Sequence, residues 1–298
     1  MQTVRMKSVR VLAITAALLL PMRHAFAESP QPVSKVGEEY EISNSYETSE
    51  QGSDGSSSSS SGRDKILERV IEVRGDGLVL EYDFPKDASV EARARDWQFP
   101  ARVFKPATGP MQLLNRAELE ARVERWLKAA KWTRAICGRW IFTWNAFRIE
   151  CDPQSVIKTI ETFDLRSADV REGATYHDAD ARAPGRLVKQ VAGPNGVTFA
   201  AVVEVDPDAV HRARAESAVV VGEIMQKPVS LEAAFREQVK ERVSGTISVA
   251  FESDSAGHVR RRIKTTKLET KRPDGETEIS TATETLERQA VPPVSAPR

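Results

Sequence analysis

The chain has 298 residues, with 43 basic and 43 acidic side chains. Removing residues 1–27, which hold four basic side chains and no acidic one, leaves 39 basic against 43 acidic, a net charge of about −4. This acidic balance argues against nucleic acid, or an anionic membrane surface, as the main partner. Hydrophobic residues make up 40% of the chain, which is enough for a packed core and excludes a wholly disordered protein.

The amino-terminal segment has the order of a secretory signal. Basic residues (Arg5, Lys7 and Arg10) precede an apolar run over 11–20, and Ala25-Phe26-Ala27 follows as a small-x-small site. The run is about half the length that spans a bilayer as a helix. We therefore expect a signal peptide over 1–27, cleavage near Ala27-Glu28, and a periplasmic or secreted mature chain without a transmembrane segment. An uncleaved anchor is the alternative.

A strand meander is expected to open the mature chain. Residues 28–36 are predicted to form a flexible leader before a strand that begins at Gly37, because Tyr40, Ile42 and Tyr46 alternate with polar residues. The serine run within 52–62 is predicted to be a flexible loop. Strands over 65–74 and 78–84 follow, separated by the turn signal Gly75-Asp76-Gly77.

About four helices are predicted in the middle of the chain. Asn115 and Glu118 have the spacing of a capping box before an apolar stripe at helical spacing. Asp152-Pro153 and Asp206-Pro207 each have the N-cap and first-turn residues of a helix start, and Ser230 caps a fourth helix. The two Asp-Pro starts each follow a predicted strand, so a faint internal duplication is an alternative to coincidence.

The carboxyl-terminal part returns to strands, with turns at Asp254–Gly257 and Pro273–Gly275 and a tail over 291–298 predicted to be disordered. Strand runs at both ends with helices between them predict one α+β domain over 37–290, built on a mainly antiparallel, curved sheet. The turn around Asp274 would place Lys264 near Glu284. The basic strand 259–268 then has two interpretations: a face paired with the following acidic strand, or an anion-binding face.

Cys137 and Cys151 are the only cysteines. In an oxidising compartment thiols pair, and the stretch between them has the pattern of two short strands around a turn near Trp144-Asn145, so we predict a disulfide between them. Two buried free thiols are the alternative. Two sulfurs without a nearby histidine do not favour a metal site, and no cofactor is expected.

The aromatic residues gather in one stretch. All five tryptophans lie between positions 97 and 144, and tryptophan often lines ligand clefts. The predicted ligand-binding residues are Trp97, Trp132, Trp140, Phe142 and Trp144. Packing in the core is the alternative explanation for the same cluster.

Few residues point to catalysis. His177 lies beside Asp178 and Asp180, which could orient its imidazole as a base, although such residues are ordinary in a polar loop. The chain has no Gly-x-Ser-x-Gly elbow, phosphate-binding loop or His-Glu-x-x-His motif. We therefore favour a non-enzymatic protein over an envelope hydrolase.

In outline, the chain resembles the curved half-barrels of the lipoprotein-carrier family. The resemblance rests on the strand opening at Gly37-Glu38-Glu39-Tyr40, the meander through Phe84, and the closing meander from Gly245 to Arg288. It implies an apolar concave face and a role as an envelope carrier. The predicted function is therefore an exported binding or carrier protein for an apolar ligand or a partner protein, and the alternative is a structural or interaction module without a ligand site.

Overall fold

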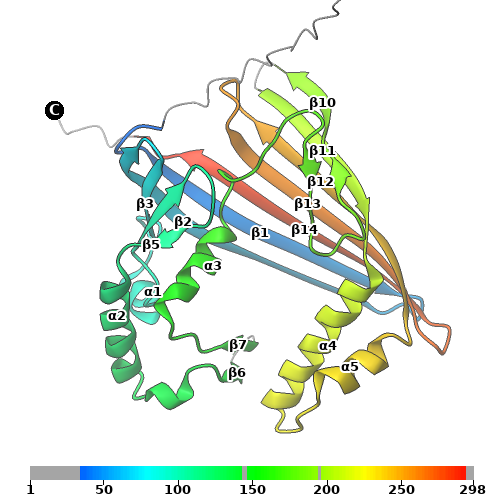
Figure 1. The fold of residues 1–298 in the computed structure, drawn as a ribbon. Coiled ribbons are helices and arrows are strands. Elements are labelled where there is room, and N and C mark those ends of the chain that lie inside the picture. Colours follow the sequence, from blue (N-terminus) through cyan, green and yellow to red (C-terminus); the bar gives the residue numbers. More distant parts are fainter. Residues whose placement is uncertain (1–33, 143–145, 194–195, 293–298) are drawn as a thin grey trace, which may run out of the picture. The chain divides into compact units, whose positions relative to one another are not determined.

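The computed structural model describes residues 34–142, 146–193 and 196–292, which belong to one compact unit over 32–298. The predicted signal peptide, most of the leader, the residues around Trp144 and the end of the tail lie outside the described residues. The fold is α+β and is dominated by a curved, open antiparallel sheet of ten strands, as predicted (Figure 1). The strands are, in spatial order, β10 (Val188–Gly193), β11 (Gly196–Glu204), β12 (Arg242–Ser253), β13 (Val259–Lys271), β14 (Thr277–Ala290), β1 (Glu39–Gly52), β2 (Ser57–Arg74), β3 (Gly77–Asp83), β4 (Ala101–Pro106) and β5 (Gln112–Leu113).

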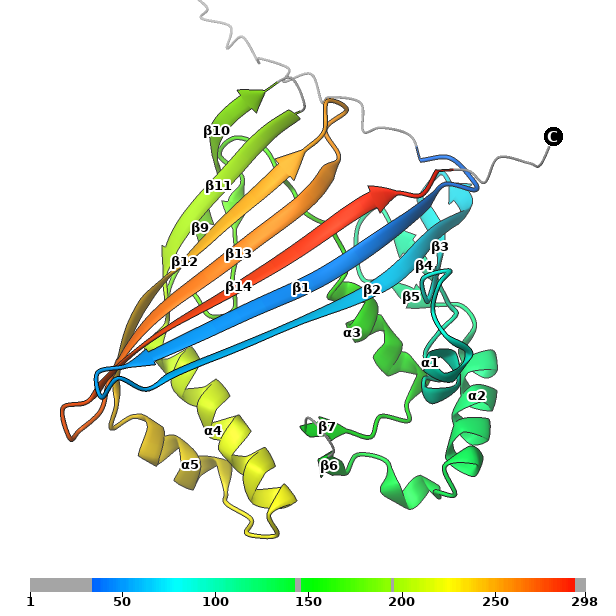
Figure 2. The same cartoon turned by 180° about the vertical axis from the view of Figure 1, so that it is seen from behind.

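The two predicted meanders share this one sheet. β1 lies between β2 and β14, so the first long strand of the chain pairs with the last one (Figure 2). Tyr40 is opposite Ala290 at one end of this pair, and Gly52 is opposite Glu278 at the other. Lys264 is opposite Glu284, as the expected turn around Asp274 requires.

The predicted helices are confirmed, with one addition. The short α1 is an element that the apolar pattern does not reveal; it begins after Ser89, whose hydroxyl accepts a hydrogen bond from the Ala92 amide. Asp206 and Ser230 cap α4 and α5 as expected. The helices are α1 (Val90–Arg95), α2 (Arg116–Ala129), α3 (Val156–Glu161), α4 (Pro207–Ile224) and α5 (Leu231–Gln238).

The capping box predicted at Asn115 does not form. Asn115 occupies the N-cap position of α2, but its side chain makes no capping hydrogen bond. The side-chain Oδ1 of Asn115 instead accepts a hydrogen bond from the backbone N–H of Arg102 at 2.9 Å. The side-chain Nδ2 donates to the backbone carbonyl oxygen of Pro100 at 3.2 Å. Asn115 therefore connects α2 to β4, because its side chain bonds to residues 100 and 102 and makes no capping bond to the backbone of its own helix.

The flexible loop predicted over 52–62 is also wrong. Only the turn at 53–56 interrupts the strands, and the serines from Ser57 onward extend β2 in register with β1. Asp54 and Gly55 allow the tight turn: the Asp54 carboxylate accepts the Ser56 amide hydrogen, and Gly55 has a φ of +86°. Pairing with β1 satisfies the backbone hydrogen-bonding groups of the serines. The serine segment therefore forms a strand although it buries no apolar surface.

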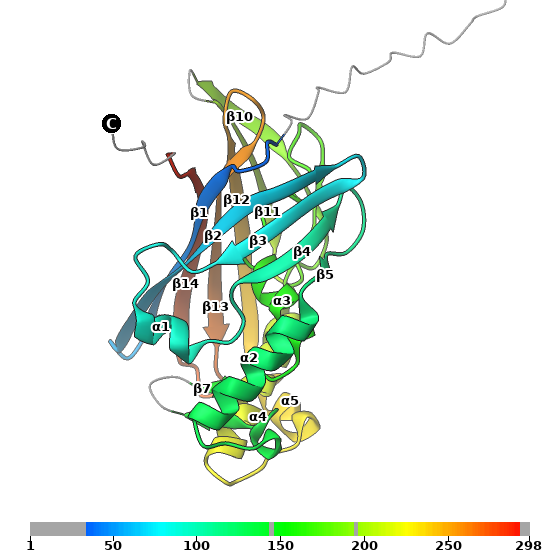
Figure 3. The same cartoon turned by 90° about the vertical axis from the view of Figure 1, so that its left-hand side faces the viewer.

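The two faces of the sheet differ in chemistry. The helices lie on one face, called here the inner face (Figures 1 and 3). At the β1–β5 end of the sheet, α2 and α3 pack on this face in a core that includes Ile42, Leu80 and Val103. Two smaller apolar clusters lie at the β11–β12 end. The opposite, outer face carries many partly exposed threonines, among them Thr265 and Thr283, whose hydroxyls lie 3.3 Å apart.

The inner face is not continuously apolar between these cores. Arg262, Lys264 and Glu284 lie on it in register, and none of them is buried. The apolar concave face that the carrier resemblance implies is therefore interrupted by charge.

A buried ion cluster connects the sheet to the segment after α3. Glu68 on β2 and Arg288 on β14 are only 1% and 4% exposed, and their side chains pair at 2.8 Å. Arg166 reaches the same Glu68 oxygen at 2.9 Å, and the Tyr82 hydroxyl donates to the other oxygen at 2.9 Å. Arg288 also stacks on Tyr40, 3.3 Å from the ring centroid. Both carboxylate oxygens of Glu68 are thus satisfied.

The electrostatics of Glu68 follow from these contacts. Burial by itself raises the pKa of the carboxyl group, but the charges and hydrogen bonds of Arg288 and Arg166 outweigh burial and lower the pKa to about 2. Burial and the Glu68 charge raise the pKa of Tyr82 well above its usual value. At neutral pH Glu68 is therefore ionised and Tyr82 keeps its proton, which are the states that the hydrogen bonds of the cluster require.

Replacing Glu68 with Ala should lower the free energy of unfolding by about 3–5 kcal/mol, because the change leaves Arg288 buried without its counter-charge. Urea unfolding at neutral pH measures this loss. The matched control is Glu72→Ala, which breaks the solvent-exposed pair with Arg74 and should cost far less, because water screens that pair. Equal losses in the two variants would contradict the assigned role of the cluster.

The cluster also predicts a pH dependence. A carboxyl whose pKa is lower in the folded state stabilises the fold above its unfolded-state pKa of 4.5, and this contribution is lost as the pH falls towards about 2. The stability difference between wild type and Glu68→Gln should therefore shrink over that interval. A difference that stays constant from pH 7 to pH 2 would show that Glu68 carries no charge in the folded protein.

Candidate functional site

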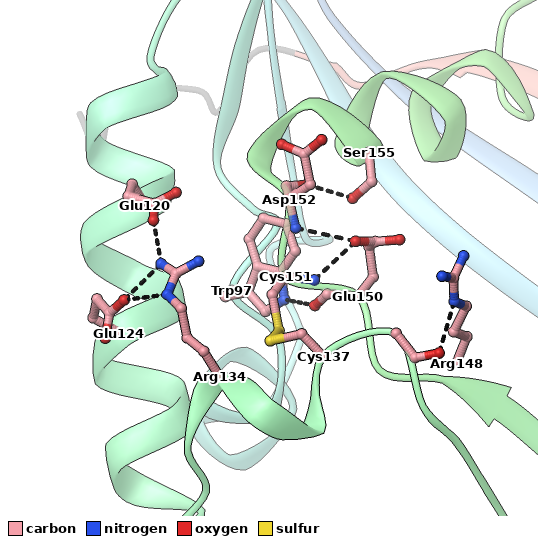
Figure 4. The surroundings of a disulfide bond; sticks show 11 residues. Trp97, Glu120, Glu124, Arg134, Cys137, Arg148, Glu150, Cys151, Asp152 and Ser155 are labelled. Atoms are coloured by element: carbon pink, nitrogen blue, oxygen red, sulfur yellow. Dashed lines mark hydrogen bonds and ion pairs between the residues drawn. A yellow bond between two sulfur atoms is a disulfide. The ribbon is translucent and has the colours of Figure 1, made fainter.

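The predicted disulfide is present. Cys137 and Cys151 are bonded, with their Cα atoms 5.7 Å apart, and they close the base of a hairpin formed by β6 (Trp140–Phe142) and β7 (Ala146–Arg148) (Figure 4). We call residues 137–151 the disulfide hairpin. The Gly138 amide donates to the carbonyl oxygen of Ile149 at 2.7 Å, which continues the pairing towards the disulfide.

The structure separates the predicted aromatic site into two groups. Trp97 is 5% exposed, and its indole N–H donates to the carbonyl oxygen of Glu150 at 3.1 Å, next to the disulfide (Figure 4). Trp132 is half-buried and packs edge-on against Trp126, with the ring centroids 5.5 Å apart. These two predicted residues thus belong to, or pack against, the core at the β1–β5 end.

The second group lies on the disulfide hairpin. Trp140 is half-buried, and Phe142 is 63% exposed. Trp144 lies outside the described residues. Ligand binding by the five predicted residues therefore remains a prediction, and the structure does not bring the four that it describes together around one cleft.

The basic strand β13 pairs with acidic neighbours. Arg261 pairs with Glu252 at 3.6 Å, and Arg262 with Glu284 at 3.8 Å. Lys264, although opposite Glu284, pairs instead with Asp178 at 2.8 Å. These contacts support the internally paired interpretation of the strand over an anion-binding face.

The residues proposed for a hydrolase do not form a catalytic arrangement. The Asp178 carboxylate accepts hydrogen bonds from the Tyr176 hydroxyl at 2.7 Å and from Lys264. Although burial alone raises the pKa of Asp178, these two donors lower it. His177 is exposed and has no hydrogen bond or ion pair with another described residue. Asp178 therefore anchors the loop to β13 and does not orient His177.

A cleft of about 550 Å³ lies between α4, α5 and the inner face of β13, and we call it the α4 cleft. Its walls combine apolar side chains with charged and hydroxyl-bearing ones. The helix side chains that line it include Val210, Ala213, Arg214 and Ser217, and those of the sheet include Thr266, Leu268 and Thr270. The remaining lining residues are Glu50, Asp180, Val205, Gln238, Glu241, Arg272 and Glu278.

The charges of the α4 cleft favour a ligand that donates hydrogen bonds. Arg214 is bound by Glu241 at 2.6 Å and by the Thr270 hydroxyl at 3.0 Å, and Arg272 is bound by Glu276 and Glu278. Both arginines are therefore neutralised by neighbours. Asp180, whose nearest cation is Lys264 at 3.7 Å, keeps acceptor capacity at the cleft.

Sequence reasoning missed the α4 cleft and the Glu68 cluster. Their residues are spread over strands and helices far apart in the chain, so no local motif connects them. One signal was available: Glu68 occupies the same strand face as Ile66 and Val70, and a lone charge on an apolar strand face requires a buried partner.

Within residues 34–142, 146–193 and 196–292, no helix is both long and apolar enough to cross a membrane. The same ranges contain no cluster of three or more His, Cys, Asp or Glu side chains that could hold a metal ion.

No family model matches the chain, and no curated protein matches it. Among solved structures, the chain is similar to one described as lipid-protein interactions in lipovitellin, with 9% identity and a TM-score of 0.36; the match covers 88% of this chain and 26% of lipovitellin. The chain thus spans about a quarter of the length of lipovitellin.

Two further solved structures are similar at a lower level. For the attachment invasion locus protein of Yersinia pestis, identity is 6%, the TM-score is 0.19, and coverage is 85% of this chain and 99% of the other. For an outer membrane channel from Pseudomonas putida, identity is 6%, the TM-score is 0.25, and coverage is 87% and 98%. At these TM-scores the similarities carry no argument about function.

The disulfide predicts a measurable stabilisation. Its loop has a sequence separation of 14, for which the chain-entropy model gives about 3 kcal/mol, so the Cys137→Ser, Cys151→Ser double variant should lose about 2–4 kcal/mol of unfolding free energy. Chemical denaturation with and without reductant measures it. Reductant should destabilise the wild type and leave the double variant unchanged; two alkylatable thiols in the native protein would contradict the bond.

Proposed function

We propose that the protein is an exported, non-enzymatic binding protein that holds an amphipathic ligand in the α4 cleft. The observation that carries the proposal is the cleft itself, a volume of about 550 Å³ with both apolar and charged walls. A few polar groups that converge on a concave, partly apolar site are typical of ligand-binding pockets. The proposal replaces the wholly apolar ligand expected from the carrier resemblance, since the inner face carries charge.

Export is supported by the disulfide and by the pattern of the amino-terminal segment. Disulfides persist in oxidising compartments and are rare in the cytosol. Cys137 and Cys151 are bonded, and residues 1–27 have the basic, apolar and small-x-small order of a secretory signal. A mature chain that begins at Glu28 in the periplasm or the culture medium is the expected product.

A ligand of this cleft would combine an apolar part with a hydrogen-bond donor or cationic group. Val210 and Leu268 offer apolar contact, while Asp180 offers a carboxylate. The group facing Arg214 must compete with Glu241 and Thr270, which already occupy the guanidinium. An anionic head group is therefore a poorer match than a cationic or neutral donor.

Filling the cleft should abolish binding. Ala213 lines the cleft on α4 and is exposed, so Ala213→Trp should block the site without disturbing the core. We expect native mass spectrometry of wild-type protein purified from envelope to show a co-purifying ligand, and its occupancy to fall at least about tenfold in the variant. Ligand binding should also raise the melting temperature of the wild type, because binding to the native state stabilises it.

The matched control is Arg212→Trp, one position along the same helix, exposed and outside the cleft lining. It should retain the ligand. A wild-type protein that carries no adduct, and whose melting temperature does not respond to an envelope extract, would contradict the proposed function; so would an Ala213→Trp protein with unchanged occupancy.

A further inference from the structure

The disulfide hairpin presents an amphipathic face to solvent. Trp140 is opposite Arg148, and Phe142 follows two residues after Trp140 on β6, so these three side chains share one face of the two-stranded ribbon. Ile141 and Phe147 lie on the other face, and Ile141 packs against the core. The face with Trp140 and Phe142 is therefore the one turned away from the core, and the Phe142 ring is 63% exposed.

The sequence around these two strands is mainly basic, and Glu150 is the acidic residue of the disulfide hairpin. Residues 131–149 contain four basic residues and no acidic residue. Arg134 is neutralised by Glu120 and Glu124 on α2. Arg139 and Arg148 are exposed and form no ion pair with any described residue. Among the described residues, the Arg148 guanidinium makes one hydrogen bond, from Nε to the carbonyl oxygen of Gly138 at 3.0 Å (Figure 4).

The helix that β6 contacts also exposes apolar residues near its end. β6 lies against α4. The last turns of α4 expose Val221 (53%) and Met225 (62%). An isolated two-stranded hairpin is at best marginally stable, but this one is closed by a disulfide and held on the core through Ile141. It can therefore present exposed aromatic rings without collapsing.

We propose that this face of the disulfide hairpin docks the protein onto an anionic lipid surface. Tryptophan and phenylalanine insert at the boundary between head groups and acyl chains, and unpaired arginines are attracted by anionic head groups. A second copy of the chain is a poorer occupant, because self-association would bring the same unpaired arginines together. The net charge of about −4 argues against an anionic membrane as the partner of the whole surface, so the proposal concerns this one face. Repulsion from acidic groups farther away than about 8–10 Å is weakened by screening at physiological salt.

This inference goes beyond the ligand in the α4 cleft and does not depend on it. The test is binding of the full mature protein to vesicles of phosphatidylcholine alone and of phosphatidylcholine with phosphatidylglycerol, measured by co-sedimentation at low and high salt. We expect the wild type to bind the anionic vesicles at least about tenfold more tightly, with the preference weakened at high salt. A blue shift of tryptophan emission should accompany binding.

Two variants locate the binding face. The double variant Arg139→Glu, Arg148→Glu should lose the preference for anionic vesicles, about tenfold or more. Phe142→Ser removes only an exposed ring and should weaken binding severalfold with the fold intact. The matched control is Arg63→Glu, Lys267→Glu, which makes the same change of charge on the outer face of the sheet and should bind like the wild type.

Several results would overturn the inference: equal binding to both vesicle types, no binding to the anionic vesicles, equal loss in the hairpin and control variants, or a dimer in solution that the hairpin variants dissociate. Ala213→Trp should keep vesicle binding. If vesicles fail to bind while the cleft ligand is retained, only the docking inference falls; if the ligand is absent while vesicles bind, only the proposed function falls.

Discussion

The buried carboxylate of Glu68 is the constraint around which the larger core is arranged. A charge that is 1% exposed is tolerated only when its hydrogen-bonding capacity is filled, and here the partners come from β14, from β3 and from the segment after α3. One side chain thereby fixes how three parts of the chain meet. Contacts that converge at this point join β2 to β14 and hold the segment after α3 against the sheet.

The apolar residues of the inner face fall into one large core and two smaller clusters, and this division bears on where the proposed binding surfaces lie. The larger core gathers α2, α3 and the base of the disulfide hairpin at one end of the sheet, while α4 and α5 cover the other end. Between them the sheet carries charged pairs such as Arg262 with Glu284. An open, polar middle leaves a cleft beside α4, and it leaves the hairpin exposed where the larger core ends.

Local signals in the sequence predicted the elements well and their partners poorly. The N-caps at Asp206 and Ser230 and the strand predicted around Ile42 rest on neighbouring residues, and the structure confirms them. The predicted capping box at Asn115 and the predicted loop at the serine run are wrong for the same physical reason. In both cases a tertiary partner, β4 for Asn115 and β1 for the serines, outweighs the local conformational preference. The disulfide was predictable because a hairpin brings its two cysteines together. The α4 cleft was not, because its walls meet only after the sheet is complete.

The position of β1 between β2 and β14 has a consequence for the order of events in biogenesis. Ser45 and Thr285, which are joined by a hydrogen bond across this pair, are 240 residues apart in the chain. Non-local pairing of this kind slows folding, since the entropy of closing a long loop opposes it. The sheet cannot be completed until almost the whole polypeptide has been synthesised, and one edge of β1 stays unpaired until then. The amino-terminal strands therefore wait, with an open edge, for the carboxyl-terminal strand that closes the sheet.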